Sequence, residues 1–366
     1  MRRSFTPTAI AILAAACASS PPSSPPTKAQ AVAEASAAHT TEAPAAEQEP
    51  ALAPPSSWAD AVERFASDCP VAFFTLSETE TREVAGERFV VQGSVWRREA
   101  SLGGPLVLGV VGAVKDNDPA TRENLQVAAL AFARAGVHLV LVNGDVVGHE
   151  TAALAPVVAM LDEVFAPPVL VHAGNSEWTS AFSEATAAAP GLINLNIVRD
   201  LDMGGTHLMS LPGYFNRRFL QAGACHYDES DVAALTSHAR DITARGHRII
   251  LTSHGPPLQQ GKGALDVTVD GEHVGDPALN TLLKRADIRV GLFSHILEAG
   301  GRATADVDGT APLKLPLKAP IERLYLNVGS VSAFGWGMND GSTSRGLAAI
   351  VVVDDAGVRA EMVKLR

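Results

Sequence analysis

The chain has 366 residues, a formal charge of −11 and three cysteines. A hydrophobic content of 46% is enough for a packed core and excludes a wholly disordered protein. Three cysteines exclude a disulfide framework, and the acidic balance argues against a nucleic-acid-binding protein, which normally carries a basic excess. The length allows one large domain or two ordinary ones.

The first residues have the pattern of a secretory leader. Basic Arg2 and Arg3 precede a short apolar run at 9–16, and Cys17 follows. This run is too short to span a bilayer as a stable anchor. No stretch of transmembrane length lies in the body of the chain, so we expect no membrane-spanning helix there.

Small residues directly before Cys17 resemble the bacterial lipobox, although Ala14 stands where that motif usually has leucine. The resemblance implies that residues 1–16 are a lipoprotein signal peptide and that Cys17 is acylated. With Ala18 next, it also implies a lipid anchor in the bacterial cell envelope, at the outer membrane if the cell has one. An ordinary secretory signal cleaved nearby is the alternative.

Residues 17–57 are rich in proline, serine and alanine and contain no aromatic residue. Such a composition cannot bury a core and predicts a disordered tether. Residues 58–104 form an N-terminal extension without readable chemistry, with a short helix from Trp58 and a strand over 88–96. Two alternatives stay open for it, since it can pack on a sheet edge or cover a cleft.

From residue 105 the pattern changes to apolar runs of strand length alternating with helical segments. The predicted order is strand 106–112, helix 121–135, strand 137–142, helix 151–165 and strand 168–173. Later elements are helix 231–245, strand 248–253, a turn at Asp270-Gly271, helix 277–285, and strands 288–293, 325–328, 348–353 and 358–363. Continuous apolar strands alternating with helices predict an α/β fold with buried parallel strands.

Polar residues follow several of these strands. Asp145, Asn175, His254 and His295 each come directly after a buried strand. Ligands gather at the carboxyl ends of strands in open α/β sheets. One carboxylate oxygen, one amide oxygen and two imidazoles make a donor set that suits Zn, Mn or Fe. The alternative is that all four are ordinary turn and cap residues.

The ordered series Gly144-Asp145, Gly174-Asn175-x-Glu177, His254-x-Pro-Pro257 and His295 resembles the calcineurin-like metallophosphoesterases. The resemblance covers about residues 105–366. It implies a two-sheet α/β/β/α sandwich with a two-metal site in loops at one edge, and it implies phosphoester hydrolysis.

The resemblance implies that one metal half-site is kept and the other lost. Asp145, Asn175, His254 and His295 occupy the four positions of one half-site. The other half-site lacks its ligands, since no Asp-x-His follows the first strand and Leu297 stands where a second His is expected. Gly148 replaces a further Asp, and Ser176 replaces the usual catalytic His.

Two ways of compensating for the lost half-site stay open. The Lys115 ammonium could stand where the lost metal would be, or the segment 116–118 (Asp-Asn-Asp) and His149 could supply ligands. The alternatives are a solvated lysine, a capping loop and a surface histidine. His138 and His172 lie in or beside apolar strands and are expected to be structural. Cys69 and Cys225 can pair in an oxidising compartment.

These observations predict a divergent metal-dependent phosphoesterase with one divalent metal ion, anchored to the envelope and weakly active. Asp145, Asn175 and His254 are its candidate catalytic residues. The alternative is a catalytically inactive member of the family that binds a phosphate-bearing ligand or acts as an envelope interaction protein. The expected partners are the membrane, through the lipid anchor, and a phosphate-bearing small molecule, with no nucleic acid.

Overall fold

The computed structural model describes residues 53–148 and 151–365. The predicted signal peptide, Cys17, most of the tether and His149 lie outside the described residues. The described residues belong to one compact unit. None of the helices among them is both long and apolar enough to cross a membrane.

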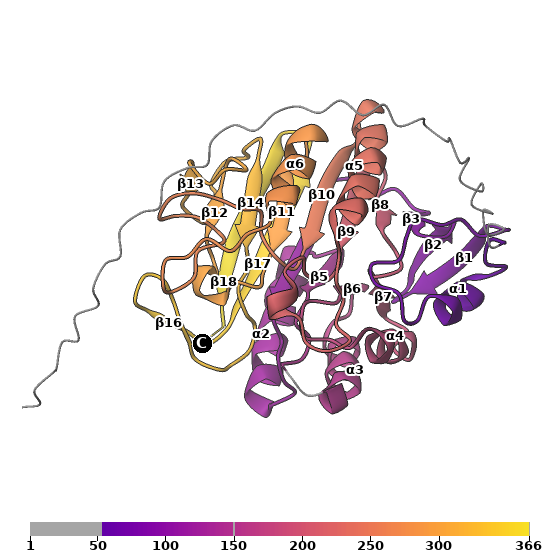
Figure 1. The fold of residues 1–366 in the computed structure, drawn as a ribbon, viewed down its shortest axis with the longest axis horizontal. Helices are drawn as coiled ribbons and strands as arrows, with labels where there is room; N and C mark the ends of the chain where they lie inside the picture. The colour runs from indigo at the N-terminus through magenta and orange to yellow at the C-terminus, as the bar shows by residue number, and fades with distance from the viewer. Residues whose placement is uncertain (1–52, 149–150, 366) are drawn as a thin grey trace, which may run out of the picture. The chain divides into compact units, whose positions relative to one another are not determined.

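Two sheets stack face to face, and helices cover both outer faces (Figure 1). The first sheet has six strands in the order β18-β17-β4-β5-β6-β7. Its strands are β4 (Leu106–Gly112), β5 (Leu139–Asn143), β6 (Val169–His172), β7 (Leu192–Asn194), β17 (Leu347–Asp354) and β18 (Gly357–Lys364). Strands β4 to β7 are parallel, and the hairpin β17–β18 adds to them in antiparallel fashion.

Three helices connect the parallel strands and lie on the outer face of this sheet. They are α2 (Pro119–Ala135), α3 (Leu154–Val164), which follows η1 (Thr151–Ala153), and α4 (Thr179–Ala187). The strand-helix-strand-helix-strand order predicted over 106–173 is therefore confirmed. Strand β4 is apolar throughout because both of its faces are buried. Leu108 packs toward the second sheet, while Val107 and Val111 pack toward the helices.

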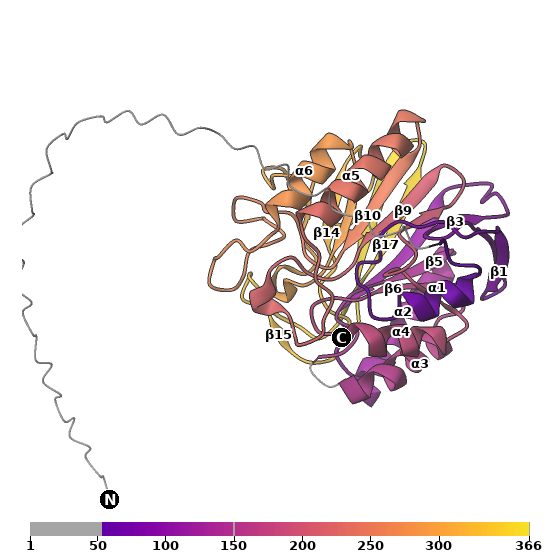
Figure 2. The same ribbon diagram turned by 45° about the vertical axis from the view of Figure 1, so that its right-hand side comes forward.

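The second sheet has ten strands in the order β1-β2-β3-β8-β9-β10-β11-β14-β12-β13. Its strands are β1 (Glu80–Val84), β2 (Glu87–Val91), β3 (Val95–Arg98), β8 (Asp200–Asp202), β9 (Thr206–Leu211), β10 (Arg248–Ser253), β11 (Val290–Phe293), β12 (Ala303–Thr304), β13 (Pro312–Leu313) and β14 (Leu324–Asn327). Helices α5 (Glu229–Ala244) and α6 (Pro277–Arg285) lie side by side on its outer face (Figure 2). The shorter elements are η2 (Arg217–Phe219), η3 (Leu297–Ala299), β15 (Trp336–Gly337) and β16 (Thr343–Ser344).

Three hydrophobic cores hold these layers together. The central core lies between the sheets and includes Leu141 from β5 and Ile250 from β10. One outer core joins the six-stranded sheet to α2, α3 and α4, and the other joins the ten-stranded sheet to α5 and α6. The predicted two-sheet α/β/β/α sandwich is confirmed.

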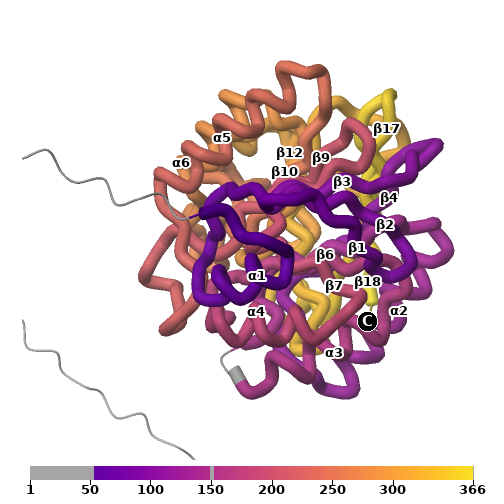
Figure 3. Tube along the Cα trace, turned by 90° about the vertical axis from the view of Figure 1, so that its right-hand side faces the viewer, coloured from indigo at the N-terminus to yellow at the C-terminus, as the bar shows by residue number. Residues whose placement is uncertain are grey.

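The N-terminal segment extends the ten-stranded sheet at one edge, where β3 pairs in parallel with β8 (Figure 3). Helix α1 (Trp58–Arg64) packs on it through an edge-to-face contact of Trp58 with Trp96, 4.9 Å between ring centroids. Of the two alternatives left open by the sequence, the structure has this segment on the sheet edge.

The single strand predicted over 88–96 is wrong, because the chain forms the hairpin β2–β3 there. Gly93 makes the turn with a φ of 100°, and a Cβ at that position would stand 2.2 Å from the Phe74 carbonyl oxygen. A disulfide joins Cys69 to Cys225 over a separation of 156 residues, so the pairing left open by the sequence is present. It ties the N-terminal segment to the loop before α5.

Candidate metal centre

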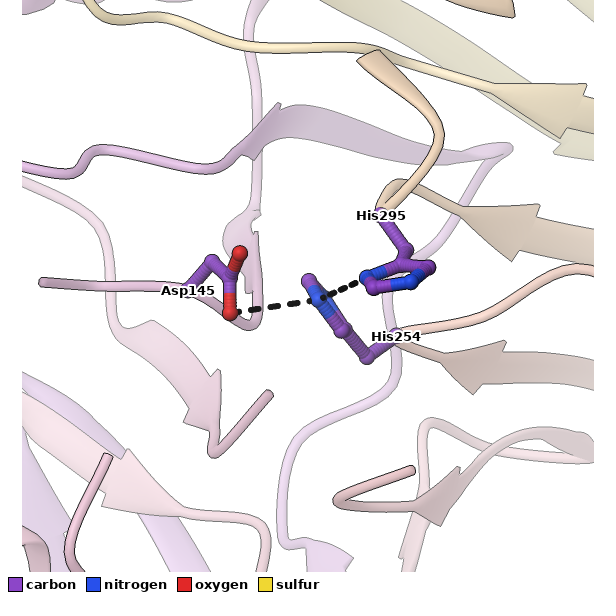
Figure 4. A group of neighbouring side chains, drawn as sticks. All are labelled: Asp145, His254 and His295. Carbon is purple, nitrogen blue, oxygen red and sulfur yellow. Dashed lines mark hydrogen bonds and ion pairs between the residues drawn. The ribbon is translucent and has the colours of Figure 1, made fainter. Parts of the chain in front are cut away.

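The carboxyl ends of four strands, two from each sheet, meet at one end of the sandwich. Asp145 follows β5, Asn175 follows β6, His254 follows β10 and His295 follows β11. Figure 4 shows Asp145, His254 and His295 pointing toward one another. One donor atom from each of these three residues lies within 4.8 Å of the other two. The prediction that strand-end residues gather at one place therefore holds for this set.

Two glycines allow the strand ends to approach this closely. Gly144 has a φ of 70°, and a Cβ there would stand 2.4 Å from His254 Nδ1. A Cβ on Gly174 would stand 2.6 Å from Asp145 Oδ1. Any side chain at either position would push Asp145 and His254 apart, which gives the Gly-Asp and Gly-Asn pairs a physical reason.

His254 is completely buried, and its tautomer is set by a backbone carbonyl. Its Nδ1 lies 3.1 Å from the Asn143 carbonyl oxygen, which can only accept a hydrogen bond. Nδ1 therefore carries the proton, and in the neutral ring the lone pair stands on Nε2. Nε2 faces into the site.

Asn175 is oriented by the chain segment that passes over it. Its Nδ2 donates a 2.8 Å hydrogen bond to the carbonyl oxygen of Phe219 in η2. The amide oxygen consequently points to the other side, where Oδ1 lies 3.0 Å from His254 Nε2.

His295 completes the pair of imidazoles. Its Nδ1 lies 3.1 Å from His254 Nε2, and its ring packs on Tyr214 at 4.1 Å between centroids. Burial, together with the neighbouring His254, lowers the pKa of His295 to about 3. The ring is therefore neutral near pH 7, and its nitrogen lone pair is available to a metal.

Asp145 is ionised and faces two neighbours with its two oxygens. Burial raises the pKa of its carboxyl group, but Lys115 and His254 outweigh burial and hold the pKa well below its usual range. Oδ1 lies 3.2 Å from His254 Nε2, and Oδ2 pairs with the Lys115 ammonium. The buried Oδ1 has no hydrogen-bond partner within the described part of the chain.

The side-chain atoms gathered here are suitable ligands for a metal ion. Around Nε2 of His254 lie the Asp145 carboxylate oxygen, the Asn175 amide oxygen and the His295 ring nitrogen, at 3.0 to 3.2 Å. With the His254 proton on Nδ1, its Nε2 presents a lone pair toward the Asp145 and Asn175 oxygens, which also only accept hydrogen bonds. A cation between these side chains would accept the lone pairs of the oxygen and nitrogen atoms. This mixed set of N and O ligands suits Zn, Mn or Fe.

The backbone is strained at this site. Of the six residues other than glycine that have positive φ among the described residues, four belong here: Ala113, Lys115, Asp145 and His295. Each such conformation costs about 1–3 kcal/mol and persists only where the surroundings impose it. Concentrated strain of this kind is typical of functional sites.

Lys115 contacts the candidate centre through Asp145. Its side chain is one-fifth exposed, and Nζ bonds Asp145 on the oxygen that faces away from His254. The backbone supports this contact, since Lys115 N donates to the Asp145 carbonyl oxygen and Gly148 N donates to the Lys115 carbonyl oxygen. A positive charge therefore stands on the opposite side of Asp145 from the two histidines.

The other candidate ligands are not brought into the donor set. Asp116 accepts from the Asp118 amide with one oxygen and from the Ser332 hydroxyl with the other, so it anchors the loop before α2. Leu297 is buried in η3 and offers no donor atom. Ser176 follows Asn175 in the loop and is nearly buried. His138 and His172 bond strand backbone or Thr252, as expected of structural histidines.

Glu177 is a positioning residue whose role the sequence did not reveal. Its buried carboxylate accepts from Val147 N at 3.0 Å and from Gly174 N at 2.6 Å. It thereby fastens the loop of Asp145 to the loop of Asn175. Burial and the charge of Asp145 raise the pKa of Glu177 to about 7. Its place in the Gly-Asn-x-Glu motif was the available signal, whereas nothing in the sequence pointed to Tyr214 or Phe219.

No family model matches the sequence, and the search of curated proteins found no match. Several solved structures share the arrangement of the chain. A dimetal phosphatase from Danio rerio is 14% identical, with a TM-score of 0.45 over 72% of this chain and 100% of that one. The anchor protein in the inner membrane complex of Plasmodium is 12% identical, with a TM-score of 0.46 over 72% and 85%.

The NAD nucleotidase of Haemophilus influenzae is 12% identical, with a TM-score of 0.39 over 71% of this chain and 49% of that one. Similarities at this level carry no argument about chemistry. The function therefore has to be argued from the residues of the site.

Proposed function

We propose that the chain is a divergent member of the metallophosphoesterase superfamily that hydrolyses phosphoesters with one divalent ion. Asp145, Asn175, His254 and His295 would hold this ion. The observation that carries the proposal is the pair of oxygens, Asp145 Oδ1 and Asn175 Oδ1, that face the lone pair of His254 Nε2, because with the His254 proton on Nδ1 none of these three atoms has a proton to donate.

A phosphoester fits the distribution of charge. Asp145 stands between a metal position on its Oδ1 side and the Lys115 ammonium on its Oδ2 side. When bound, the ion would supply Lewis acidity toward a phosphoryl oxygen. Lys115 would hold a fixed positive charge beside it, and fixed charges directed at a phosphoryl group are the main source of stabilisation in phosphoryl transfer.

Weak turnover is part of the proposal. Ser176 stands where the resemblance implies a catalytic His, and a hydroxyl cannot protonate a leaving group near neutral pH. Loss of a general acid costs about 10²–10⁴-fold in rate. The same observation favours the second candidate, a catalytically inactive member of the superfamily that binds a phosphate-bearing ligand through the metal and Lys115.

For location, we propose the bacterial cell envelope, through an acyl group on Cys17. The basic, apolar and small-residue series before Cys17 supports this, as does the tether-like composition of residues 17–57. The disulfide Cys69–Cys225 supports an oxidising compartment. Radiolabelled palmitate incorporation into the wild-type chain, lost in Cys17→Ser, would test the anchor.

Elemental analysis and an activated diester test the site. We expect about one Zn, Mn or Fe per chain and slow cleavage of bis(4-nitrophenyl) phosphate. Asn175→Ala and Asp145→Asn should lower both metal content and cleavage, whereas Asp241→Asn, the same chemical change on the exposed face of α5, should leave both unchanged. Metal without cleavage would select the binding alternative, and a metal-free protein that cannot be loaded would overturn both.

A further inference from the structure

One loop contacts two of the four candidate ligands. This loop covers residues 213–225, between β9 and α5. The Tyr214 ring packs on the His295 ring at 4.1 Å between centroids. The carbonyl oxygen of Phe219 accepts the 2.8 Å hydrogen bond from Asn175 Nδ2 that turns the amide oxygen toward the site. The loop therefore sets the orientation of one imidazole and one amide of the centre.

The two ends of this loop meet at Cys225. Tyr214 N donates a 3.1 Å hydrogen bond to the Cys225 carbonyl oxygen. Gly213 packs so closely on Cys225 that a Cβ on the glycine would stand 2.5 Å from this oxygen and 2.6 Å from Sγ. Close-packed interiors transmit displacements. A shift of Cys225 would therefore displace Tyr214, which is fully buried against His295.

The disulfide Cys69–Cys225 holds this closure from outside the loop. Cys69 belongs to the N-terminal segment, which is anchored two residues further on. There, Val71 N donates to the Asn196 carbonyl oxygen at 3.1 Å, and the Val71 carbonyl oxygen accepts from the buried Arg199 guanidinium at 2.7 Å. The disulfide thus ties the loop to a part of the chain that is itself fixed by hydrogen bonds.

We infer that the oxidation state of the Cys69–Cys225 pair controls the affinity of the centre for its metal ion. With the disulfide formed, the loop holds Asn175 and His295 in the orientation that binds an ion. With two thiols instead, Cys225 is released from the N-terminal segment, and both ligands lose part of their support. The inference rests on the proposed function, because it concerns the ion that this centre would bind.

The reduced state requires a dithiol as co-reactant. One thiolate of the dithiol attacks Cys69 Sγ, since Cys69 is half-buried whereas Cys225 is buried, and Cys225 leaves as a thiolate that takes up a proton. The second thiol of the dithiol then displaces Cys69, so that two electrons pass to the pair and the dithiol becomes a disulfide. In an oxidising compartment the reverse exchange restores the bond, so the proposed export of the chain would also raise its metal affinity.

Zinc affinity tests the inference in a Cys17→Ser background, in which Cys69 and Cys225 are the remaining cysteines. Replacing both by serine mimics the reduced state without thiols that would themselves bind zinc. We expect the affinity to fall about 10- to 100-fold in a competition titration, as it does when groups that orient metal ligands are lost. Reduction of the parent with dithiothreitol, removed before the titration, should also lower it. Val91→Ala removes buried packing from β2 in the same N-terminal segment, and as the control for lost stability it should leave the affinity unchanged.

Hydrogen exchange of the metal-free protein gives a second readout. The amides of Tyr214 and Gln221 bond the carbonyl oxygens of Cys225 and Asn175. In the double serine variant both amides should exchange faster than in the parent, because the loop opens more often, whereas amides of α2 should exchange at the same rate.

The outcomes separate this inference from the proposed function. Weaker zinc binding together with faster exchange in the loop supports it. Zinc bound equally by the parent and the double serine variant, or equal exchange in the loop, overturns the inference alone. Absence of zinc binding in both proteins overturns the proposed function and this inference with it. Loss of far-UV circular dichroism in the double serine variant also overturns the inference, because the cross-link would then hold the whole fold and not the loop.

Discussion

Replacing Lys115 with methionine removes the ammonium group that pairs with the Asp145 carboxylate. This carboxylate has almost no contact with water. The side chain of Asp145 is 4% exposed and that of Lys115 is 20% exposed. Removing one partner of a buried ion pair leaves an uncompensated charge, which costs about 3–5 kcal/mol. Because Lys115 is partly exposed, we expect Lys115→Met to lower the unfolding free energy of the metal-free protein by about 3 kcal/mol, at the lower end of that range.

A divalent ion should reverse part of this loss. An ion at the Oδ1 side of Asp145 supplies positive charge to the same carboxylate, and the absence of Lys115 also removes a repulsive charge from the ion. Both effects act in one direction, so zinc should raise the unfolding free energy more in Lys115→Met than in the wild type. Binding to the folded state alone stabilises it by RT ln(1 + [L]/Kd), which makes the two increments comparable at one zinc concentration.

Urea unfolding followed by far-UV circular dichroism, in EDTA and in excess zinc, measures these quantities. Lys262→Met, the same change on an exposed loop, is the control. Asp145→Asn and the double variant complete a thermodynamic cycle, for which we expect a coupling energy of about 2–3 kcal/mol. The reasoning would be refuted by a coupling energy below about 0.5 kcal/mol, the usual value for independent sites.

Three further predictions follow from contacts around the site and the fold. Glu177→Gln loses one of two carboxylate acceptors that join the ligand loops, so zinc affinity should fall about 10- to 100-fold in a competition titration, whereas the exposed Glu184→Gln should not change it. Replacing both cysteines by serine removes a cross-link over 156 residues and should lower the unfolding free energy by at most about 5 kcal/mol, and an unchanged urea midpoint would argue that the bridge is absent in solution. Burial raises the pKa of Asp200, but hydrogen bonds from His207 and His238 outweigh it and hold the pKa below its usual 3.8. A lowered pKa stabilises the fold above the unfolded-state pKa and loses that contribution as pH falls through the folded-state pKa, so Asp200→Asn should flatten the decline of stability below about pH 4.

The sequence predicted the central part of the fold because parallel strands buried on both faces are read directly as apolar runs. Strands β4, β5 and β6 fall within two residues of their predicted bounds. Strand β8 was missed because its three residues, Asp200–Asp202, are mostly polar and are held by pairing with β3 and β9. The turn at Gly93 was missed for a similar reason, since the contact with Phe74 that requires a glycine there is not local.

The sequence predicted which residues gather at the candidate site, but not the geometry of their contacts. Strand ends in a parallel sheet converge, so the order of Asp145, Asn175, His254 and His295 was sufficient to group them. The contact between Lys115 and Asp145 depends on positive φ at Ala113 and Lys115, and no local pattern indicates this backbone path. Glu177, likewise, acts through amides of two loops that only the folded chain brings together.

Under the proposed function, the position of Lys115 favours the refitting of the site to one metal over the decay of a two-metal site. Loss of the second set of ligands alone would leave Oδ2 of the buried Asp145 without a positive partner, at a cost of several kcal/mol. Selection for stability alone would remove that cost most simply by replacing Asp145 with a neutral residue. The chain instead keeps the carboxylate, supplies an ammonium on one oxygen and retains two imidazoles and an amide on the other side. The strained Asp145 and His295 backbones, which a stable fold does not require, add to the support for the proposed single-metal centre.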